Sequence, residues 1–278
     1  MTKLKDISLI ALDLDDTTLR SDASLAPETR EAIQRAISAG IDVVIASGRA
    51  FRSLPQSVTG IPGIKYAITS NGAAIERVPS GERIVSLTLS HDTVAAVLRL
   101  FGGELLECFI EGQAYCDARY LADPMRFGCS AAYVDYVLTT RLAVDDMPAF
   151  IAENAHRLDS IDVLGKNPEH KMQLWDRALE LENAYITSSG ARHIEISAAG
   201  SGKGAALRRL CDILGVTAGE VAAFGNGEND ADMLVFAGFG VAVGNAVDGC
   251  KAAADFVCQT NNDFGVAKTI DMILGEKT

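Results

Sequence analysis

Short apolar runs alternate with amphipathic segments toward both ends of the chain. The first run, Ile7 to Leu12, ends at Asp13, and residues 27–39 then repeat apolar positions at helical spacing, with Pro27 in the first turn. By the same patterns we expect further strands at residues 41–46, 66–69, 221–224, 239–243 and 255–258, and further helices at residues 203–214 and 230–237. Strands separated by helices of this length predict an α/β fold with a Rossmann-like parallel-sheet core.

The middle of the chain has a different pattern. From residue 83 to about residue 188, polar and apolar positions alternate, and Gly112-Gln113 and Ser189-Gly190 are typical hairpin turns. The strands and helices expected here lie at residues 105–111, 114–119, 147–158, 168–182, 185–187 and 193–197. We therefore predict a core domain of residues 1–82 and 189–278, interrupted by an inserted α+β domain of residues 83–188.

The composition is that of a globular protein with an acidic surface. Apolar residues make up 48% of the 278 residues, and the formal net charge is -12. Such a surface repels nucleic acid and anionic membranes, so we expect neither as a partner. The six cysteines form no Cys-x-x-Cys pair, no apolar stretch is long enough to span a membrane, and the first apolar run is too short for a signal peptide. We expect buried, reduced thiols and a cytoplasmic location.

Two acidic side chains follow the first predicted strand. Asp13 and Asp15 stand two residues apart in the segment LDLDDTT, and in an extended chain such residues face the same way. The carboxyl ends of parallel strands form the crevice in which open α/β sheets bind ligands. One carboxylate could attack phosphorus while the other delivers a proton to the leaving oxygen. A strand end decorated with surface acids would show the same local pattern.

Phosphoryl transfer to a carboxylate makes further demands on the sequence. A divalent cation must offset the repulsion between carboxylate and phosphate, and a lysine together with hydroxyl or amide donors must hold the phosphate oxygens. Ser47-Gly48 follows the second predicted strand, Lys203 begins a predicted helix, and the segment GNGEND follows the strand at 221–224. All of these groups therefore stand at strand or helix ends, in an order consistent with one site.

These segments resemble the four motifs of the haloacid dehalogenase superfamily of phosphatases. The motifs stand here as Asp13, Asp15 and Thr17 for D-x-D-x-T, Ser47-Gly48 for Ser/Thr-Gly, Lys203 for the lysine motif, and GNGENDADML for the last motif. The segment TSNGAAI at residues 69–75 adds to the likeness. The chain resembles the Cof-type subgroup, in which a large α+β (type IIB) cap is inserted after the second motif.

The resemblance implies a magnesium-dependent phosphatase that acts on small phosphorylated metabolites, such as sugar phosphates, through an aspartyl-phosphate. Asp13 would be the nucleophile, Asp15 the general acid and base, and Lys203 the third catalytic residue. The Mg²⁺ ligands would be Asp13, the backbone carbonyl of Asp15, Asn226 and Asp230. The substrate-binding residues would be Thr17, Ser47, Gly48, Arg49, Asn71 and Asn229. Asn71 fits a turn residue with positive φ equally well.

Asn226 departs from the family pattern, which has aspartate at this place. Asparagine keeps one carbonyl oxygen but lacks the negative charge, so Mg²⁺ should bind less tightly. A natural variant with weaker metal affinity, a weakened homologue and an engineered substitution all fit this residue. Three functions therefore remain open: a phosphate monoester hydrolase, a sugar phosphomutase with the same cap type, and a phospho-ligand-binding protein without turnover.

Overall fold

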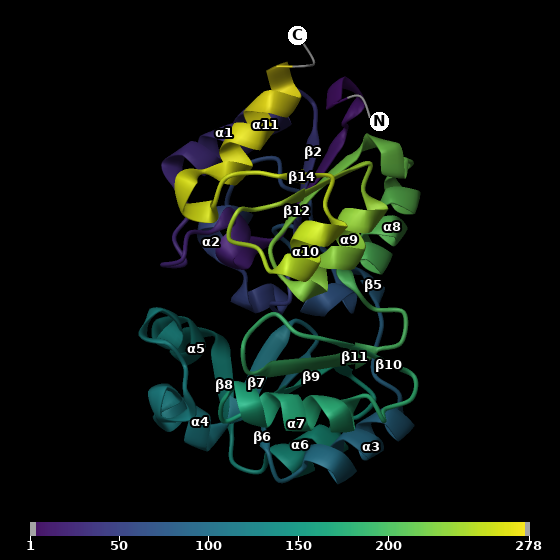
Figure 1. The fold of residues 1–278 in the computed structure, drawn as a ribbon. Coiled ribbons are helices and arrows are strands. Elements are labelled where there is room, and N and C mark those ends of the chain that lie inside the picture. Colours follow the sequence, from purple (N-terminus) through teal and green to yellow (C-terminus); the bar gives the residue numbers. More distant parts are fainter. Residues whose placement is uncertain (1–3, 276–278) are drawn as a thin grey trace.

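The chain folds around two β-sheets (Figure 1). The structure is a computed structural model and describes residues 4–275. The larger sheet has the strand order β14-β13-β12-β1-β2-β3-β4-β5. These strands are β1 (Leu9–Leu12), β2 (Asp42–Ala46), β3 (Tyr66–Thr69), β4 (Ala74–Arg77), β5 (Arg83–Ser86), β12 (Val221–Gly225), β13 (Phe239–Ala242) and β14 (Phe256–Val257). Neighbouring strands from β14 to β3 are parallel, whereas β4 pairs antiparallel with both β3 and β5.

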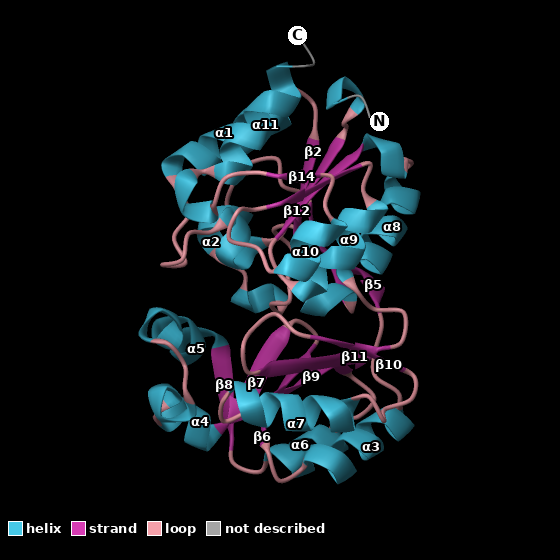
Figure 2. Ribbon diagram, in the orientation of Figure 1, coloured by secondary structure: helices cyan, strands magenta, loops and turns pink. Residues whose placement is uncertain are grey.

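Helices cover both faces of the larger sheet (Figure 2). They are α1 (Pro27–Ser38), α2 (Gln56–Thr59), α8 (Lys203–Leu214), α9 (Ala231–Phe236), α10 (Asp248–Ala253) and α11 (Gly265–Gly275). The α1 helix packs against α11, and α8 packs against α9 on the other side of the sheet. Because α1 turns Ala32, Ile33 and Ala36 inward and every residue of β1 is buried, this sheet carries the main hydrophobic core. The predicted α/β fold with a parallel-sheet core is confirmed.

The smaller sheet has the strand order β10-β11-β9-β6-β7-β8. Its strands are β6 (Leu105–Ile110), β7 (Gln113–Asp117), β8 (Arg141–Val144), β9 (Leu158–Leu164), β10 (Ala184–Thr187) and β11 (His193–Ala198), and its helices are α3 (His91–Phe101), α4 (Ala118–Ala122), α5 (Val134–Thr140), α6 (Met147–Glu153) and α7 (Pro168–Ala178). In Figure 1, α3, α6 and α7 lie on the face turned away from the larger sheet. The opposite face of the smaller sheet is therefore turned toward the larger one.

Side chains alternate between the two faces of the smaller sheet, as the period of a strand requires. On β9, Ile161 and Val163 join the hydrophobic cluster that includes residues of α3, α6 and α7. Asp162, between them, lines a cavity that lies between the two sheets. On β6, Cys108 belongs to the same cluster while Glu107 lines the cavity. The inserted region thus has its own hydrophobic core on one face and polar groups on the other.

The sheet topology corrects the predicted boundaries of the inserted region. β5 begins at Arg83 but pairs with β4 in the larger sheet, and β11 follows residue 189 but pairs with β9 in the smaller sheet. The inserted region therefore runs from the end of β5 to the end of β11. The helix expected at 147–158 ends at Glu153 because Leu158 already begins β9. The helix expected at 168–182 ends at Ala178.

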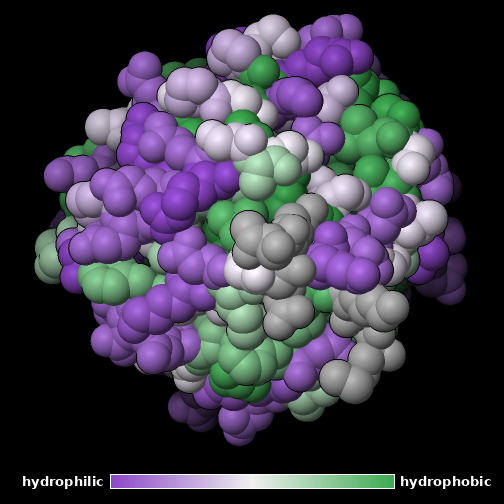
Figure 3. All heavy atoms as spheres, turned by 90° about the horizontal axis from the view of Figure 1, so that it is seen from above, coloured by the Kyte–Doolittle hydropathy of each residue, from purple (hydrophilic) through white to green (hydrophobic). Residues whose placement is uncertain are grey.

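The helix α11 lies along the outer part of the larger-sheet half, away from the smaller sheet (Figure 1). Seen from that side, the surface is largely hydrophilic with hydrophobic residues scattered between (Figure 3). Within residues 4–275, no helix is both long and apolar enough to cross a membrane. The six cysteines form no disulfide. The cytoplasmic location stays a prediction.

Arg83 connects the two sheets through charge. Its guanidinium donates to both carboxylate oxygens of Asp159 on β9, at 2.7 and 2.5 Å, and its Nε lies 3.3 Å from Glu76 Oε1 on β4. Thr69 Oγ1 also donates to Glu76 Oε2 at 2.7 Å. Burial raises the pKa of Glu76 to about 7, although Thr69 and Arg83 act in the opposite direction. Ionisation of Glu76 at this buried position therefore lowers the stability of the folded protein.

Glu76→Gln should gain stability relative to the parent protein as the pH rises. A carboxyl group with a raised pKa stabilises the folded state below its unfolded pKa of 4.5, and this contribution is lost as the pH rises through about 7. Glutamine has no proton to lose, so the difference in free energy of unfolding should shift in its favour by on the order of 1–3 kcal/mol between pH 5 and pH 8. Urea unfolding at both pH values measures this, with the exposed Glu82→Gln as control. A difference independent of pH would contradict it.

Gly72 marks a close approach between the two segments of the larger-sheet half. Its φ is +87°, and a Cβ at this position would lie 2.2 Å from the carbonyl oxygen of Gly202. The adjacent Asn71 carbonyl accepts a hydrogen bond from Gly202 N at 2.8 Å. A side chain at Gly72 would therefore separate the loop after β3 from the start of α8.

Gly72→Ala should lower the free energy of unfolding by at least about 2 kcal/mol more than Gly215→Ala does. Both glycines have left-handed φ values, +87° and +71°, so both substitutions carry the same backbone strain. Nothing lies within 4 Å of a Cβ at Gly215, so the difference between the variants isolates the contact with Gly202. Chemical denaturation measures it. Equal losses in the two variants would show that the loop moves aside freely.

Candidate active site

The residues predicted to carry the chemistry gather at the carboxyl ends of the central parallel strands. Asp13 follows β1, Ser47 follows β2, Asn71 follows β3, and Asn226 follows β12. The register continues past the strand ends, because Asp13 N donates to Phe224 O at 3.1 Å. These strands are neighbours in the sheet, so their ends open onto one crevice. Lys203 reaches the same crevice from the first residue of α8.

A buried lysine joins the two acids of this crevice. Lys203 Nζ lies 2.7 Å from Asp13 Oδ1 and 2.6 Å from Asp230 Oδ1. Lys203 is 1% exposed, Asp13 4% and Asp230 0%. An ammonium and carboxylates can be buried together only when each charge has a close partner. The three side chains therefore form one electrostatic unit.

Burial and charge act against each other on these groups. Burial raises the pKa of Asp13 to about 7, and the nearby charge of Asp230 adds to the rise, while Lys203 opposes it. Burial alone would lower the pKa of Lys203, but the two carboxylates outweigh it and raise that pKa. Lys203 is thus held as a cation. Any further positive charge near Asp13 would stabilise its ionised carboxylate.

Asp13 has one oxygen free for chemistry. Its Oδ2 is buried and accepts no hydrogen bond from the residues that the structure describes. Asn226 adds an amide carbonyl nearby, whose Oδ1 accepts from Thr17 Oγ1 at 3.1 Å. Carboxylate, amide and backbone carbonyl oxygens are the ligands that Mg²⁺ prefers, and it needs few of them from the protein. Within residues 4–275 no three His, Cys, Asp or Glu side chains converge as a metal cluster, so such a site would rest on Asp13, Asn226 and the Asp15 carbonyl.

Asp230 holds two neighbouring groups in place. Its Oδ1 is bonded to Lys203, and its Oδ2 accepts from the backbone N–H groups of Asn226 at 2.8 Å and Gly227 at 2.9 Å. These contacts anchor Lys203 and the loop that carries Asn226. The role of Asp230 as a metal ligand stays a prediction.

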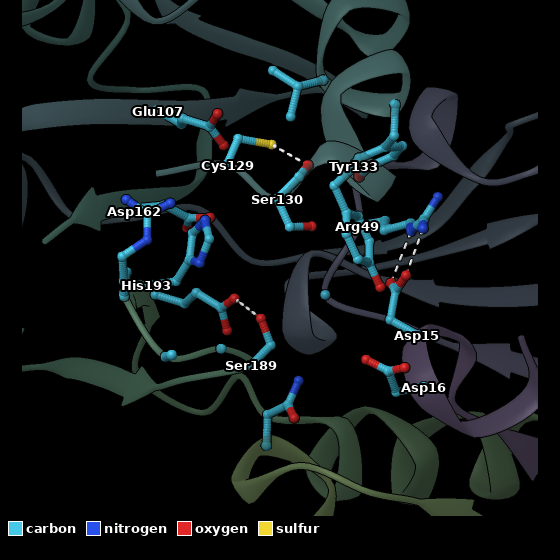
Figure 4. Close-up of a pocket in the computed structure, with 18 of the residues that line it drawn as sticks. Asp15, Asp16, Arg49, Glu107, Cys129, Ser130, Tyr133, Asp162, Ser189 and His193 are labelled. Atoms are coloured by element: carbon cyan, nitrogen blue, oxygen red, sulfur yellow. Dashed lines mark hydrogen bonds and ion pairs between the residues drawn. The ribbon is translucent and has the colours of Figure 1, made fainter. Parts of the chain in front are cut away.

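Arg49 holds the second acid of the first motif. Its Nη2 and Nε donate to Asp15 Oδ1 and Oδ2 at 2.5 and 2.8 Å, a bidentate pair visible in Figure 4. The guanidinium also lies 4.0 Å from the ring centroid of Tyr136, and the guanidinium of Arg141 lies 4.4 Å from the same centroid. Because Tyr136 and Arg141 belong to the inserted region, this stack connects Asp15 to that region.

Asn71 connects the phosphate-binding candidates to the inserted region. Its Oδ1 accepts from Asn229 Nδ2 at 3.0 Å, and its Nδ2 donates to Glu195 Oε2 of β11 at 2.9 Å. Its φ is +50°, so it is a turn residue with positive φ and a contact residue at once. A Cβ at Gly48 would lie 3.1 Å from Asn71 Oδ1, so a side chain after Ser47 would require the Asn71 side chain to shift slightly.

A cavity of about 350 Å³ lies between the crevice and the smaller sheet. The predicted residues Asp13, Asp15, Gly48, Arg49, Asn226 and Asn229 line it. Ser47, Thr17 and Lys203 are buried beside it, with Ser47 Oγ accepting from Arg49 N at 3.1 Å. The volume is that of a site for a small molecule. The structure thus brings these predicted residues together around one partly open cavity.

Sequence reasoning missed the far wall of this cavity. The smaller sheet contributes Glu107, Arg141, Asp162, His193 and Glu195, and the helix α5 contributes Tyr136. The sequence signal for this wall is the presence of acidic residues between apolar ones in the strands β6, β9 and β11. Such a pattern is usually interpreted as a strand with one face exposed to solvent, so it does not indicate a cavity. Only the packing of a second sheet above it turns that face into a cavity wall.

Comparison with known proteins gives consistent results over nearly the whole chain. A family model described as haloacid dehalogenase-like hydrolase matches residues 10–270. The 5-amino-6-(5-phospho-D-ribitylamino)uracil phosphatase YwtE of Bacillus subtilis (strain 168) is 30% identical over 287 residues, which cover 95% of this chain and 97% of that protein.

Two solved structures extend the comparison to the fold. A haloacid dehalogenase-like hydrolase from B. subtilis superposes with a TM-score of 0.82 at 29% identity, covering 95% of this chain and 99% of that one. The sugar phosphatase BT4131, described as HAD subclass IIB, superposes with a TM-score of 0.78 at 19% identity, covering 97% of this chain and 99% of that one. At that identity the second likeness concerns the fold, including the inserted region.

Lys203→Met should lower the free energy of unfolding by about 3–5 kcal/mol, because it leaves two carboxylates buried without their cation. Urea denaturation measures the loss, and the exposed Lys166→Met should change stability by less than about 0.5 kcal/mol. Adding Asp13→Asn to Lys203→Met should recover part of the loss, since one uncompensated charge is removed. No recovery in the double variant would show that the loss of stability comes from lost packing of the Lys203 aliphatic chain, and not from charge.

Proposed function

This chain belongs to the haloacid dehalogenase-like hydrolases, and we propose that it is a Mg²⁺-dependent phosphatase that hydrolyses phosphate monoesters of small metabolites through an aspartyl-phosphate on Asp13. The observation that carries the proposal is the free, buried Oδ2 of Asp13 at the wall of the cavity, with Oδ1 held by Lys203. The related YwtE is named a phosphatase, which favours hydrolysis over mutase chemistry.

In the first step Asp13 Oδ2 attacks phosphorus. A bond forms between Oδ2 and phosphorus, the bond from phosphorus to the leaving oxygen breaks, and Asp15 donates a proton to that oxygen. Lys203 holds Asp13 in place and offsets its charge. Ser47, Asn229 and the backbone beside Gly48 supply donors for the phosphoryl oxygens.

In the second step Asp15 takes a proton from water, the water oxygen bonds to phosphorus, and the bond from phosphorus to Asp13 Oδ2 breaks. In the resting arrangement Asp15 is paired with Arg49, so that pair must open before Asp15 carries a proton. A phosphate anion in the cavity competes with Asp15 for the Arg49 guanidinium, which makes substrate binding itself the trigger. Mg²⁺, held by Asp13, the Asp15 carbonyl and Asn226, would supply the positive charge that offsets repulsion between carboxylate and phosphate.

Asn226 then sets the metal requirement rather than removing activity. Asn226→Asp should lower the Mg²⁺ concentration that gives half-maximal turnover by about tenfold, because a carboxylate adds charge where the amide has none. The substitution fits the local contacts, since Thr17 can donate to a carboxylate oxygen as it does to Asn226 Oδ1.

Phosphate release from an aryl phosphate, with Mg²⁺ titrated, tests these statements. We expect turnover by the parent protein, a loss of at least about a thousandfold in Asp13→Asn, and tighter metal dependence in Asn226→Asp. Turnover that appears only in Asn226→Asp would mean that the chain is a disabled phosphatase. Folded protein without turnover in either form would refute hydrolysis and favour a binding role.

A further inference from the structure

Three acidic residues stand side by side on the cavity face of the smaller sheet, and we call them the acidic row. Glu195 of β11 lies directly opposite Asp162 of β9, which lies directly opposite Glu107 of β6. All three line the cavity, and their exposed fractions are 5%, 5% and 1% in that order. Figure 4 shows Glu107 and Asp162 across the cavity from Asp15.

Three acidic side chains at neighbouring positions destabilise the folded sheet when no ligand is bound. Like charges at directly opposite positions destabilise strand pairing, and burial makes each unpaired charge more costly. The two ends of the row have partners of different kinds. Arg141 Nη2 forms an ion pair with Glu107 Oε2 at 3.3 Å, whereas the neutral amide of Asn71 donates a hydrogen bond to Glu195 Oε2 at 2.9 Å. Ser189 Oγ donates to the other oxygen of Glu195.

In the middle of the row, Asp162 feels the charge of Arg141, but one of its carboxylate oxygens has no hydrogen-bond donor. Asp162 Oδ1 is buried and accepts no hydrogen bond from any residue between 4 and 275. Arg192 also lines the cavity, but its Nη1 donates to the backbone carbonyls of Phe127 and Gly165. Burial lowers the pKa of His193, so that imidazole adds no charge at neutral pH. Burial, Glu195 and Glu107 raise the pKa of Asp162, and Arg141 and Ser160 oppose this rise only in part.

Resting on the proposed phosphatase function, we propose that the acidic row binds a protonated amino group on the leaving-group part of the substrate, with Asp162 as the main acceptor. An ammonium would add a further positive charge to the row, and it would give Asp162 Oδ1 an N–H donor. A hydroxyl would supply a donor but leave the excess negative charge in place. The substrate class is therefore phosphate monoesters that carry an amine.

One small molecule can reach both ends of the cavity. The walls include Asp13 and Asn229 at the phosphoryl end and Asp162 and Glu195 at the other. Asn71 spans the distance between these ends with its single side chain, because it hydrogen-bonds Asn229 on one side and Glu195 on the other. An amine a few bonds from the phosphate therefore fits the geometry.

Matched phosphate esters test the inference. Glucosamine 6-phosphate carries an ammonium that glucose 6-phosphate and N-acetylglucosamine 6-phosphate lack, and 6-aminohexyl phosphate paired with hexyl phosphate lets the amine find its own position. For at least one pair we expect kcat/KM of the parent protein to favour the amine by about tenfold or more. Asp162→Asn keeps the side-chain volume and should abolish the preference, mainly through KM. Glu153→Gln, an exposed acid on α6, should leave the preference intact.

Binding to a variant that cannot turn over separates this inference from the proposed function. Calorimetry on Asp13→Asn, with and without Asp162→Asn, measures affinity for the same pairs. An amine preference that disappears with Asp162→Asn supports the inference even if no ester is hydrolysed, an outcome that would overturn only the phosphatase proposal. Equal affinity and equal turnover within every pair, or a preference that survives Asp162→Asn, overturns the inference. Aryl phosphate turnover would then still support the phosphatase.

Discussion

The buried ammonium of Lys203 is the contact around which both halves of the larger sheet are arranged. It lies against Asp13, which follows β1, and against Asp230, which follows β12. By engaging one oxygen of each carboxylate it decides where the other oxygen points. Asp13 Oδ2 is left free beside the cavity, and Asp230 Oδ2 is left to hold the N–H groups of the loop at Asn226. The proposed nucleophile and the candidate metal site thus depend on one cation supplied by a helix far along the chain.

A second line of contacts ties the chemistry to the inserted region. Asp15 pairs with Arg49, Arg49 and Arg141 lie near the same Tyr136 ring, and Arg141 reaches Glu107 of the acidic row. The two ends of the cavity, to which the phosphoryl group and the leaving group are proposed to bind, are therefore connected through side-chain contacts as well as through the space between them.

Most elements of the larger-sheet half were predictable from the sequence, because short patterns of apolar and polar residues mark its strands and helices. The helix at 203–214 has the predicted bounds, and Asp13, Ser47 and Asn226 end strands that read as short apolar runs. The strand β9 was not recognised, because in LDSIDVL the polar positions face a cavity that only the tertiary fold creates. The contacts of Asp230 were equally hidden, since a motif shows that an acid is present but not that its oxygens bind a lysine and two backbone N–H groups.

The position of β1 in the sheet has a consequence for how the chain is made. β1 is the first strand to be synthesised, yet it lies between β2 and β12, and β12 begins only at Val221. While the ribosome is still adding the whole inserted region, the β12-facing edge of this wholly apolar strand has no partner. Unpaired apolar edges attract other chains, so the nascent protein passes through a long interval in which it is exposed to aggregation and open to chaperones. The inserted region, whose sheet is built from a continuous stretch of sequence, can fold during that interval, before the larger sheet is complete.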